Sequence, residues 1–174
     1  MLDLTANTIT PLGSQMEARS VKFSHVHMTE MVLPTHTNSL GSVFGGTVMS
    51  WIDIAAAISA QRHSKSSVVT ASIDDLHFVA PVYKGWVVNL KACVNMVART
   101  SMEVGVRVDA ENPLTGETFH TASAYLTFVA LDQNGKPKNV PGLLVESDEE
   151  KRRLEAAKRR RQWRLERRDF YKAK

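Results

Sequence analysis

The chain of 174 residues has a single cysteine, Cys93, and lacks any long apolar run. One thiol excludes a disulfide within the chain and a zinc site built on several cysteines, and it favours a reducing compartment. No stretch approaches the ~18 consecutive apolar residues of a membrane-spanning helix, so we expect no membrane span. The N-terminus also lacks the basic start and apolar core of a signal peptide. We therefore expect a cytoplasmic protein.

Most of the chain is close to electrically neutral. The net charge is +4, and residues 147–174 alone carry twelve Lys or Arg and six Asp or Glu. The rest of the chain therefore has a net charge of −2, and the basic character belongs to the tail. Basic tails can bind nucleic acid through phosphates. Here the acidic residues are interspersed and no aromatic stacking platform accompanies them, so we expect no nucleic-acid partner.

Hydrophobic periodicity predicts one central helix and several strands. Apolar residues recur at helical spacing from Thr47 to about Arg62, and they lie on almost all sides, as in a helix buried in a core. Alternating β-branched and aromatic residues predict strands at 21–33, 67–79, 86–97, 102–110 and 118–131. Strands with one polar face favour antiparallel pairing. We therefore predict an α+β fold in which a five-stranded antiparallel sheet wraps around one helix.

The sequence predicts one domain with an extension at each end. We expect a flexible arm over residues 1–20, the domain over 21–135, and a linker followed by a basic helix over 136–174. Ser147 and the acidic residues after it predict the start of that helix. Its weak docking contacts are predicted to be Leu154, Ala157, Trp163, Leu165 and Phe170. Because one helix cannot cover both faces of the sheet, we expect the chain to associate with itself.

Asp53 is the unusual polar residue of the central helix, since it lies between Ile52 and Ile54. A lone carboxylate in apolar surroundings costs on the order of several kcal/mol unless it is paired or neutralised. Loss of water around a carboxylate also favours its use as a base. The alternative is that Asp53 lies on a narrow exposed edge of the helix.

The pair Gly45-Gly46 stands directly before the helix. Glycines there allow a ligand to approach the N–H groups of the first turn, which lack intrahelical partners and can hold an oxyanion. The alternative is ordinary turn chemistry, which also applies to Asn38 in the preceding loop. The six histidines lack the spacing of a metal site, so we expect no metal.

Taken together, these motifs resemble the signature of hotdog-fold acyl-CoA thioesterases, in the cytosolic long-chain and bacterial YciA-like group. The segment HTNSLGSVFGGTVMSWIDIAAAISAQRH holds Asn38, Gly41, Phe44-Gly45-Gly46 and Asp53 in the order of that signature. VTAS at 69–72, FVAPVYKG at 78–85 and RTSM at 99–102 also match. Each motif is weak alone, but their order and spacing are specific, and the likeness covers roughly residues 21–131.

The resemblance implies a fold, an assembly and a reaction. Hotdog domains pair edge to edge, with active sites at the dimer interface, and we expect a dimer or a hexamer. The reaction implied is hydrolysis of acyl-CoA thioesters to fatty acid and CoA, with Asp53 as base or nucleophile and Asn38 from the facing subunit. Gly46 and Thr47 would donate N–H groups to the oxyanion. The resemblance places further residues against the substrate: Phe44, Gly45, Thr70, Arg99, Thr100 and Ser101.

Other functions stay open beside this one. CoA is part of the substrate, so no cofactor is expected. A hotdog-fold dehydratase or hydratase needs a histidine paired with an acid in the site, and the segment from Phe44 has no histidine before His63. A non-catalytic protein that binds CoA or nucleic acid is the other alternative. Release of free CoA from acyl-CoA separates these functions, whereas the acyl chain length cannot be read from the sequence.

Overall fold

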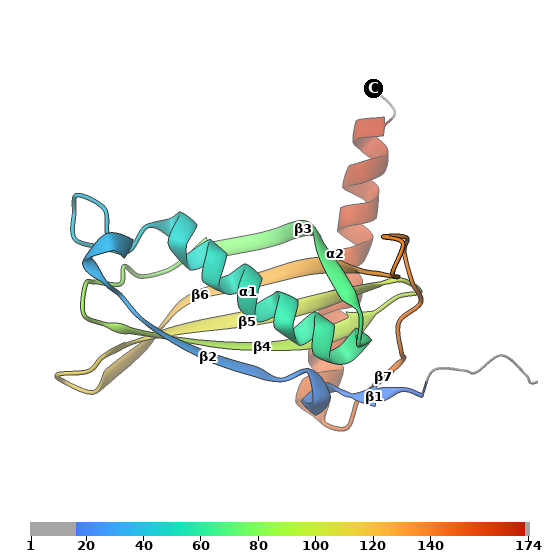
Figure 1. Ribbon diagram of the computed structural model, residues 1–174, viewed down its shortest axis with the longest axis horizontal. Coiled ribbons are helices and arrows are strands. Elements are labelled where there is room, and N and C mark those ends of the chain that lie inside the picture. The colour runs from blue at the N-terminus through green and yellow to red at the C-terminus, as the bar shows by residue number, and fades with distance from the viewer. Residues whose placement is uncertain (1–16, 173–174) are drawn as a thin grey trace, which may run out of the picture.

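A five-stranded antiparallel sheet carries one helix on each face in the computed structural model, which describes residues 17–172 (Figure 1). The predicted α+β architecture is therefore confirmed. The strands lie in the order β2-β4-β5-β6-β3, so that β2 and β3 form the two edges. Their bounds are β2 (Val26–Met31), β3 (Ser67–Phe78), β4 (Val87–Val97), β5 (Ser101–Asn112) and β6 (Glu117–Leu131).

Helix α1 (Gly45–Ser64) lies along one face of the sheet and forms the core with it. Val48, Ile52 and Ala56 are fully buried on its inner side. The expectation that the helix is buried on almost all sides is wrong for a single chain. Met49 and Ile54 are 39% and 46% exposed, because one sheet covers only one side of a helix. Within residues 17–172 an apolar strip of α1, marked by Met49 and Ile54, is thus left partly exposed.

The strand predicted from residue 21 is shorter than expected at both ends. Residues Val21–Ser24 form the 3-10 helix η1, and β2 begins at Val26. The Ser24 hydroxyl donates to the carbonyl of Val21 at 2.7 Å and accepts the N–H of Val94 at 3.0 Å. This buried serine bends the backbone and ties the bend to β4. A second 3-10 helix, η2 (Pro34–His36), follows β2.

The two extensions meet in a small parallel sheet. Residues 1–16 of the expected arm lie outside the described residues, whereas β1 (Arg19–Ser20) pairs with β7 (Leu143–Leu144) inside the predicted linker. The linker is also tied to the end of α1, since Nε2 of the buried His63 lies 3.0 Å from the carbonyl of Pro141. Burial lowers the pKa of His63, and the hydrogen bond to Pro141 opposes this only in part.

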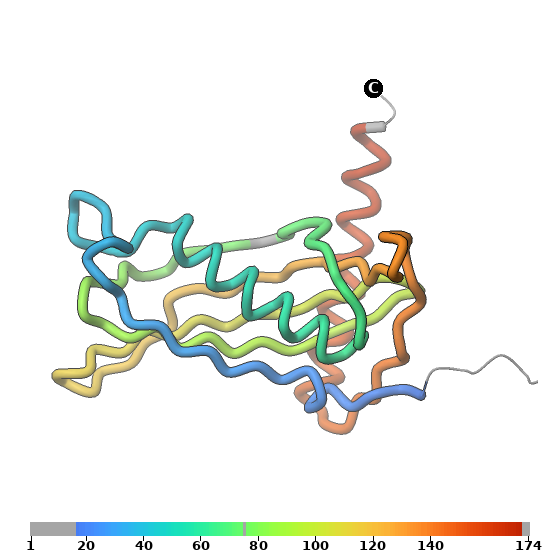
Figure 2. The backbone as a smooth tube through the Cα atoms, viewed as in Figure 1, coloured from blue at the N-terminus to red at the C-terminus, as the bar shows by residue number. Residues whose placement is uncertain are grey.

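Helix α2 (Asp148–Lys172) crosses the face of the sheet opposite α1 (Figures 1 and 2). Its start is a reciprocal cap, in which Glu150 and Ser147 accept each other's backbone N–H at 3.2 Å. Of the predicted docking residues, Ala157 is fully buried, whereas Trp163 and Phe170 are exposed. Apolar contacts therefore carry only part of the docking.

An ion pair between the sheet and α2 contributes much of the remaining docking. Glu103 on β5 is 1% exposed, and Arg160 donates to both of its carboxylate oxygens, at 2.7 Å for the shortest contact. The Arg160 guanidinium also lies 3.5 Å from the ring centroid of Tyr125 on β6. Removing one partner of such a pair leaves a buried charge without compensation.

We expect Arg160→Ala to lower the free energy of unfolding by ~3–5 kcal/mol, because Glu103 then stays buried without a cation. Chemical denaturation followed by circular dichroism measures the change. Arg159→Ala removes the same charge from an exposed neighbour and should alter stability by less than about 0.5 kcal/mol. Equal effects of the two substitutions would show that the pair with Glu103 does not hold α2 on the sheet.

Candidate active site

Asp53 lies halfway along α1, on the side of the helix that faces the edge strand β3. The Thr70 hydroxyl on β3 donates to Oδ1 of Asp53 at 2.8 Å. Asp53 is half-buried and Thr70 is exposed, so the carboxylate is not enclosed by its own chain. The structure is closer to the alternative of an exposed helix edge than to a carboxylate sealed in the core. The pair opens toward the free edge of the sheet.

Asn38 lies in the loop before α1, where its side chain organises the turn. Its amide oxygen accepts the N–H of Leu40 at 2.9 Å and the N–H of Ser42 at 3.3 Å. Its Nδ2 donates to the Ser42 hydroxyl at 3.0 Å. The oxygen is thus already used inside the loop, while Nδ2 has a second hydrogen to donate. The loop holds the amide in one orientation.

The first turn of α1 offers free N–H groups beside this loop. Within residues 17–172 the N–H of Gly46 takes part in no hydrogen bond, as expected at a helix start. The N–H of Thr47 instead donates to the carbonyl of Phe44 at 3.0 Å. A side chain at Gly45 would place its Cβ 3.5 Å from the ring of Phe78 at the end of β3. Phe78 therefore covers Gly45, whereas a Cβ at Gly46 would meet nothing within 4 Å.

The third group of predicted residues lies at the other end of the sheet. Arg99, Thr100 and Ser101 form the turn between β4 and β5, where Ser101 pairs with Val129 and Val129 with Val69. This is the end at which β3 begins, and the glycine pair lies where β3 ends. Arg99 is exposed, and its carbonyl accepts the N–H of Val140 at 3.0 Å.

One chain therefore brings the predicted residues together in three separate groups. Asn38 and the start of α1 form one, Asp53 and Thr70 the second, and the turn at 99–101 the third. Gly46 and Asp53 are seven residues apart, about 10 Å along the helix axis. Thr70 was expected to contact substrate, whereas the structure shows it as the hydrogen-bond donor to Asp53. Only the fold could reveal that contact, because the two residues lie on different elements.

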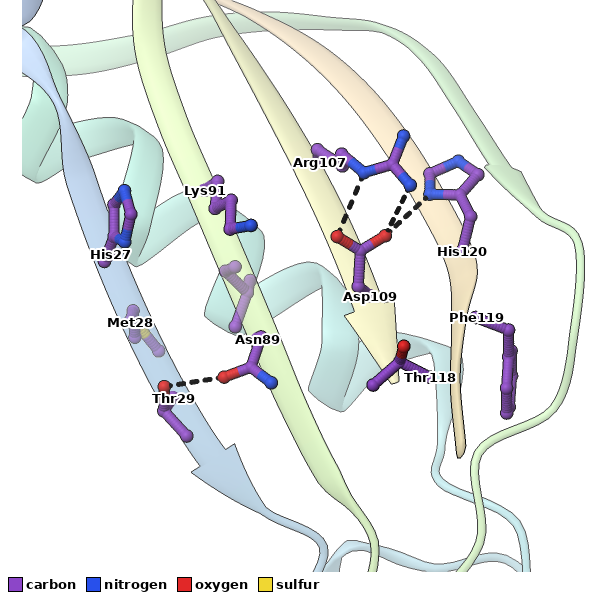
Figure 3. A pocket seen from close by; sticks show the side chains of 11 residues that line it. His27, Met28, Thr29, Asn89, Lys91, Arg107, Asp109, Thr118, Phe119 and His120 are labelled. Carbon is purple, nitrogen blue, oxygen red and sulfur yellow. Dashed lines mark hydrogen bonds and ion pairs between the residues drawn. The ribbon is translucent and has the colours of Figure 1, made fainter. Parts of the chain in front are cut away.

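A polar pocket lies on the face of the sheet opposite α1 (Figure 3). It has a volume of about 360 Å³ and is lined by residues of β2, β4, β5 and β6. Arg107 and His120 both contact Asp109 there, the closest atoms being 2.8 Å and 3.3 Å apart. Partial burial favours the protonated form of Asp109, but Arg107 and His120 outweigh it and hold its pKa below the usual value. None of the predicted site residues lines this pocket, and within residues 17–172 no three acidic, His or Cys side chains group as metal ligands.

Comparison with known proteins places this arrangement in context. A family model described as thioesterase superfamily matches residues 40–117. The chain is 46% identical over 134 residues to a protein of Bacillus subtilis named an uncharacterized acyl-CoA thioester hydrolase, covering 77% of this chain and 78% of that protein. It is 36% identical over 146 residues to the mouse cytosolic acyl coenzyme A thioester hydrolase, covering 83% of this chain but only 38% of that longer protein.

Solved structures agree with these relatives. The crystal structure of a hexameric acyl-CoA thioesterase has a TM-score of 0.85 and 44% identity, and covers 87% of this chain and 97% of that one. An acyl-CoA hydrolase of Staphylococcus aureus in complex with butyryl coenzyme A and coenzyme A has a TM-score of 0.84 and 38% identity. That match covers 90% of this chain and 95% of the other.

Three structures of variants of the S. aureus hydrolase bear on the site residues. In them an asparagine, an aspartate and a threonine are each replaced by alanine. The aspartate follows the asparagine by fifteen residues, and the threonine follows the aspartate by seventeen. In the chain described here, Asp53 follows Asn38 by fifteen residues and Thr70 follows Asp53 by seventeen. The three residue types thus recur in both chains at the same spacing.

Proposed function

This chain belongs to the thioesterase superfamily as a relative of bacterial acyl-CoA thioester hydrolases, and from this premise we propose that it hydrolyses acyl-CoA thioesters to a free fatty acid and CoA. The observation that carries the proposal is the Asp53 carboxylate, held by Thr70 at the open edge of the sheet. Support comes from the identical spacing of Asn, Asp and Thr in the S. aureus hydrolase, whose structure contains butyryl coenzyme A.

The proposed reaction begins at the thioester carbonyl. In one form, Asp53 takes a proton from a water molecule, whose oxygen attacks the carbonyl carbon. In the other, Asp53 attacks directly and forms an acyl anhydride that water then hydrolyses. Either way the carbon–sulfur bond breaks, the CoA thiolate leaves and takes up a proton, and the acyl group departs as a carboxylic acid. Thr70 fixes the rotamer of the carboxylate through its hydrogen bond.

Charge that develops on the carbonyl oxygen needs donors, and the loop and the helix start supply them in this proposal. The N–H of Gly46 is free within the described residues, and Nδ2 of Asn38 has one hydrogen left to donate. Since the oxygen of Asn38 is already used in its loop, we assign Asn38 to polarising the thioester rather than to holding the water. Thr47 contributes less, because its N–H already donates to Phe44.

A second copy of the chain completes the site in this proposal. In one chain, Asp53 is bonded to Thr70 on the edge strand β3, and among residues 17–172 Asn38 bonds only within its own loop. Pairing at that edge would bring Asn38 of one copy to Asp53 of the other, in two equivalent sites per dimer. The hexameric thioesterase that this chain resembles at a TM-score of 0.85 supports assembly of such dimers into a hexamer.

The remaining contacts and the setting of the enzyme are also part of the proposal. Phe44 and Gly45 would flank the thioester, and the turn at 99–101, with the exposed cation of Arg99, would lie along the CoA moiety. The reaction as written requires only a carboxylate, hydrogen-bond donors and water, so we propose no resident cofactor or metal. Among residues 17–172 no helix is both long enough and apolar enough to cross a bilayer. A cytoplasmic location stays our expectation, supported by the cytosolic mouse relative.

The alternative of a dehydratase or hydratase lacks support at the site. Such an enzyme needs a histidine beside the acid, whereas the side chain found on Asp53 is a threonine. His36 packs its ring against Trp51, with centroids 5.2 Å apart, and His63 is hydrogen-bonded to Pro141 at the far end of α1. A hydration assay with an enoyl-CoA substrate should therefore show no activity.

We expect Asp53→Asn to lower kcat by about 10² or more while acyl-CoA binding stays near that of the wild type, because the amide keeps the size but loses the base. Release of free thiol from acyl-CoAs of increasing chain length measures the rate, and equilibrium binding of CoA measures affinity. Asp148→Asn, which removes an exposed carboxylate on α2, is the matched control. Full activity of Asp53→Asn would refute the proposed role of Asp53.

Thr70→Val should lower kcat about tenfold with little change in KM, because it keeps the shape of the side chain but removes the hydrogen bond to Asp53. Thr70→Ser retains the hydroxyl and should restore most of the rate. If Thr70 instead contacts substrate, Thr70→Val would raise KM and leave kcat unchanged. Steady-state kinetics with one acyl-CoA distinguish the two roles.

Mixed oligomers test whether two copies share the site. In a dimer of one Asp53→Asn chain and one Asn38→Ala chain, one site carries both lesions and the other carries none. Co-expression with two affinity tags isolates such dimers, and we expect about half the wild-type activity per dimer, although each variant alone is impaired. Purified mixed dimers without recovered activity would show that Asn38 and Asp53 act within one chain.

A further inference from the structure

Helix α2 presents one stripe of side chains to the sheet, and this stripe crosses the strands in order. Arg153 donates to the sulfur of Cys93 on β4 at 3.4 Å, and Arg160 pairs with Glu103 on β5. The next member, Arg164, forms an ion pair with Asp74 on the edge strand β3. With the buried Ala157, the stripe has the spacing of four, three and four residues that marks one helix face.

The helix does not end where its own sheet ends. After the contact of Arg164 with β3, eight more residues continue to Lys172, which is about 12 Å of helix. This segment, residues 165–172, is called the overhang below. In Figure 1 it projects past β3, away from the rest of the chain. At 4.8 Å between neighbouring strands, its length equals two to three strands of an adjoining sheet.

The stripe that faces the sheet continues into the overhang. Seven residues after Arg164 it reaches Tyr171, which is 68% exposed. Tyr171 therefore lies on the face that contacts strands earlier in the helix, beyond the last strand that the described residues form. Trp163, on the flank of the same face, is 63% exposed. Large aromatic side chains that combine an apolar ring with a polar group, such as Tyr and Trp, are typical of protein interfaces.

The edge beside the overhang is also uncovered. Strand β3 has twelve residues and a neighbour on one side only, whereas the opposite edge, β2, has six. Val69 and Ile73 on β3 are 46% and 38% exposed. A long edge strand with apolar side chains favours pairing with another strand.

We propose that the overhang of α2 is a strap that crosses the β3 edge and binds the outer sheet face of a second copy of this chain. A two-fold axis at the edge makes the contact reciprocal, so that each copy places its Tyr171 on the strands of the other. The strap holds the two sheets together from the face opposite α1, where no candidate site residue lies. It depends on self-association but not on acyl-CoA hydrolysis.

A second copy fits this surface better than a different partner does. The overhang continues the docked part of α2, so it stands at about the same height above the plane of the sheet (Figure 1). A sheet extended past β3 by a second copy would therefore continue beneath it. The stripe carries Arg164 and Arg167 at the edge, and both contact Asp74 of their own chain, Arg167 at 3.9 Å. Arg164 precedes the overhang and Arg167 lies in its first turn, while Arg168 pairs with Asp169 inside the overhang. These three cations thus have acidic partners within the chain, which favours an aromatic contact through Tyr171 over a basic patch.

Hydrogen exchange on the full-length wild-type protein tests the proposal directly. We expect the amides of residues 165–172 to be protected as well as those of residues 153–164, because both segments lie on a sheet. Dilution of the oligomer to monomer should remove the protection of 165–172 and leave that of 153–164 in place. Fast exchange of the overhang in the intact oligomer would overturn the proposal. So would protection that arises only when phosphatidylserine vesicles or duplex DNA are added.

A substitution then tests the side chain. Tyr171→Ser should raise the dissociation constant of the dimer at least tenfold, as measured by light scattering over a range of concentrations, since a central aromatic contact dominates an interface of this kind. Leu114→Ser is the matched control, because Leu114 is 93% exposed on the turn between β5 and β6. Unchanged association of Tyr171→Ser, or an equal effect of both substitutions, would also overturn the proposal.

Discussion

One helix against one sheet is the constraint on which the rest of this structure depends. Five strands bury the inner side of α1 and leave Met49 and Ile54 on its other side exposed. The same side carries Asp53, and the edge strand β3 beside it is unpaired. The exposed apolar strip, the open edge and the carboxylate therefore form one continuous region. Residues 17–172 place no further element there, so whatever covers the strip also encloses Asp53.

On the face of the sheet opposite α1, ion pairs rather than apolar side chains carry most of the docking of α2. Glu103 and Asp74 point out of the sheet toward α2, and long arginine side chains reach them from the helix. The excess of positive charge in the tail is thus partly compensated by acids of the domain. This explains why a segment so rich in cations docks on its own sheet.

Local patterns predicted the elements, and tertiary contacts decided what they missed. Helical spacing and strict alternation located α1 and the strands β3 to β6, because these signals lie within each segment. The bend at Ser24 was missed because it depends on Val94, seventy residues away. Likewise the resemblance to a family signature, carried by the order of Asn38, Gly46 and Asp53, indicated the candidate site, but it did not show that Thr70 holds Asp53. Periodicity also gave no sign of which arginines of α2 face inward.

The candidate site is divided between elements that one chain completes to different extents. In one chain Asp53 is half-buried, so its carboxylate still reaches water. Removing that water requires cover over the strip of α1, and residues 17–172 of one chain supply none. Asn38 is fixed in its loop and the N–H of Gly46 is free before any partner arrives. In the single chain the loop amide and the free N–H group are therefore already in place, whereas the described residues leave the surroundings of Asp53 open to solvent.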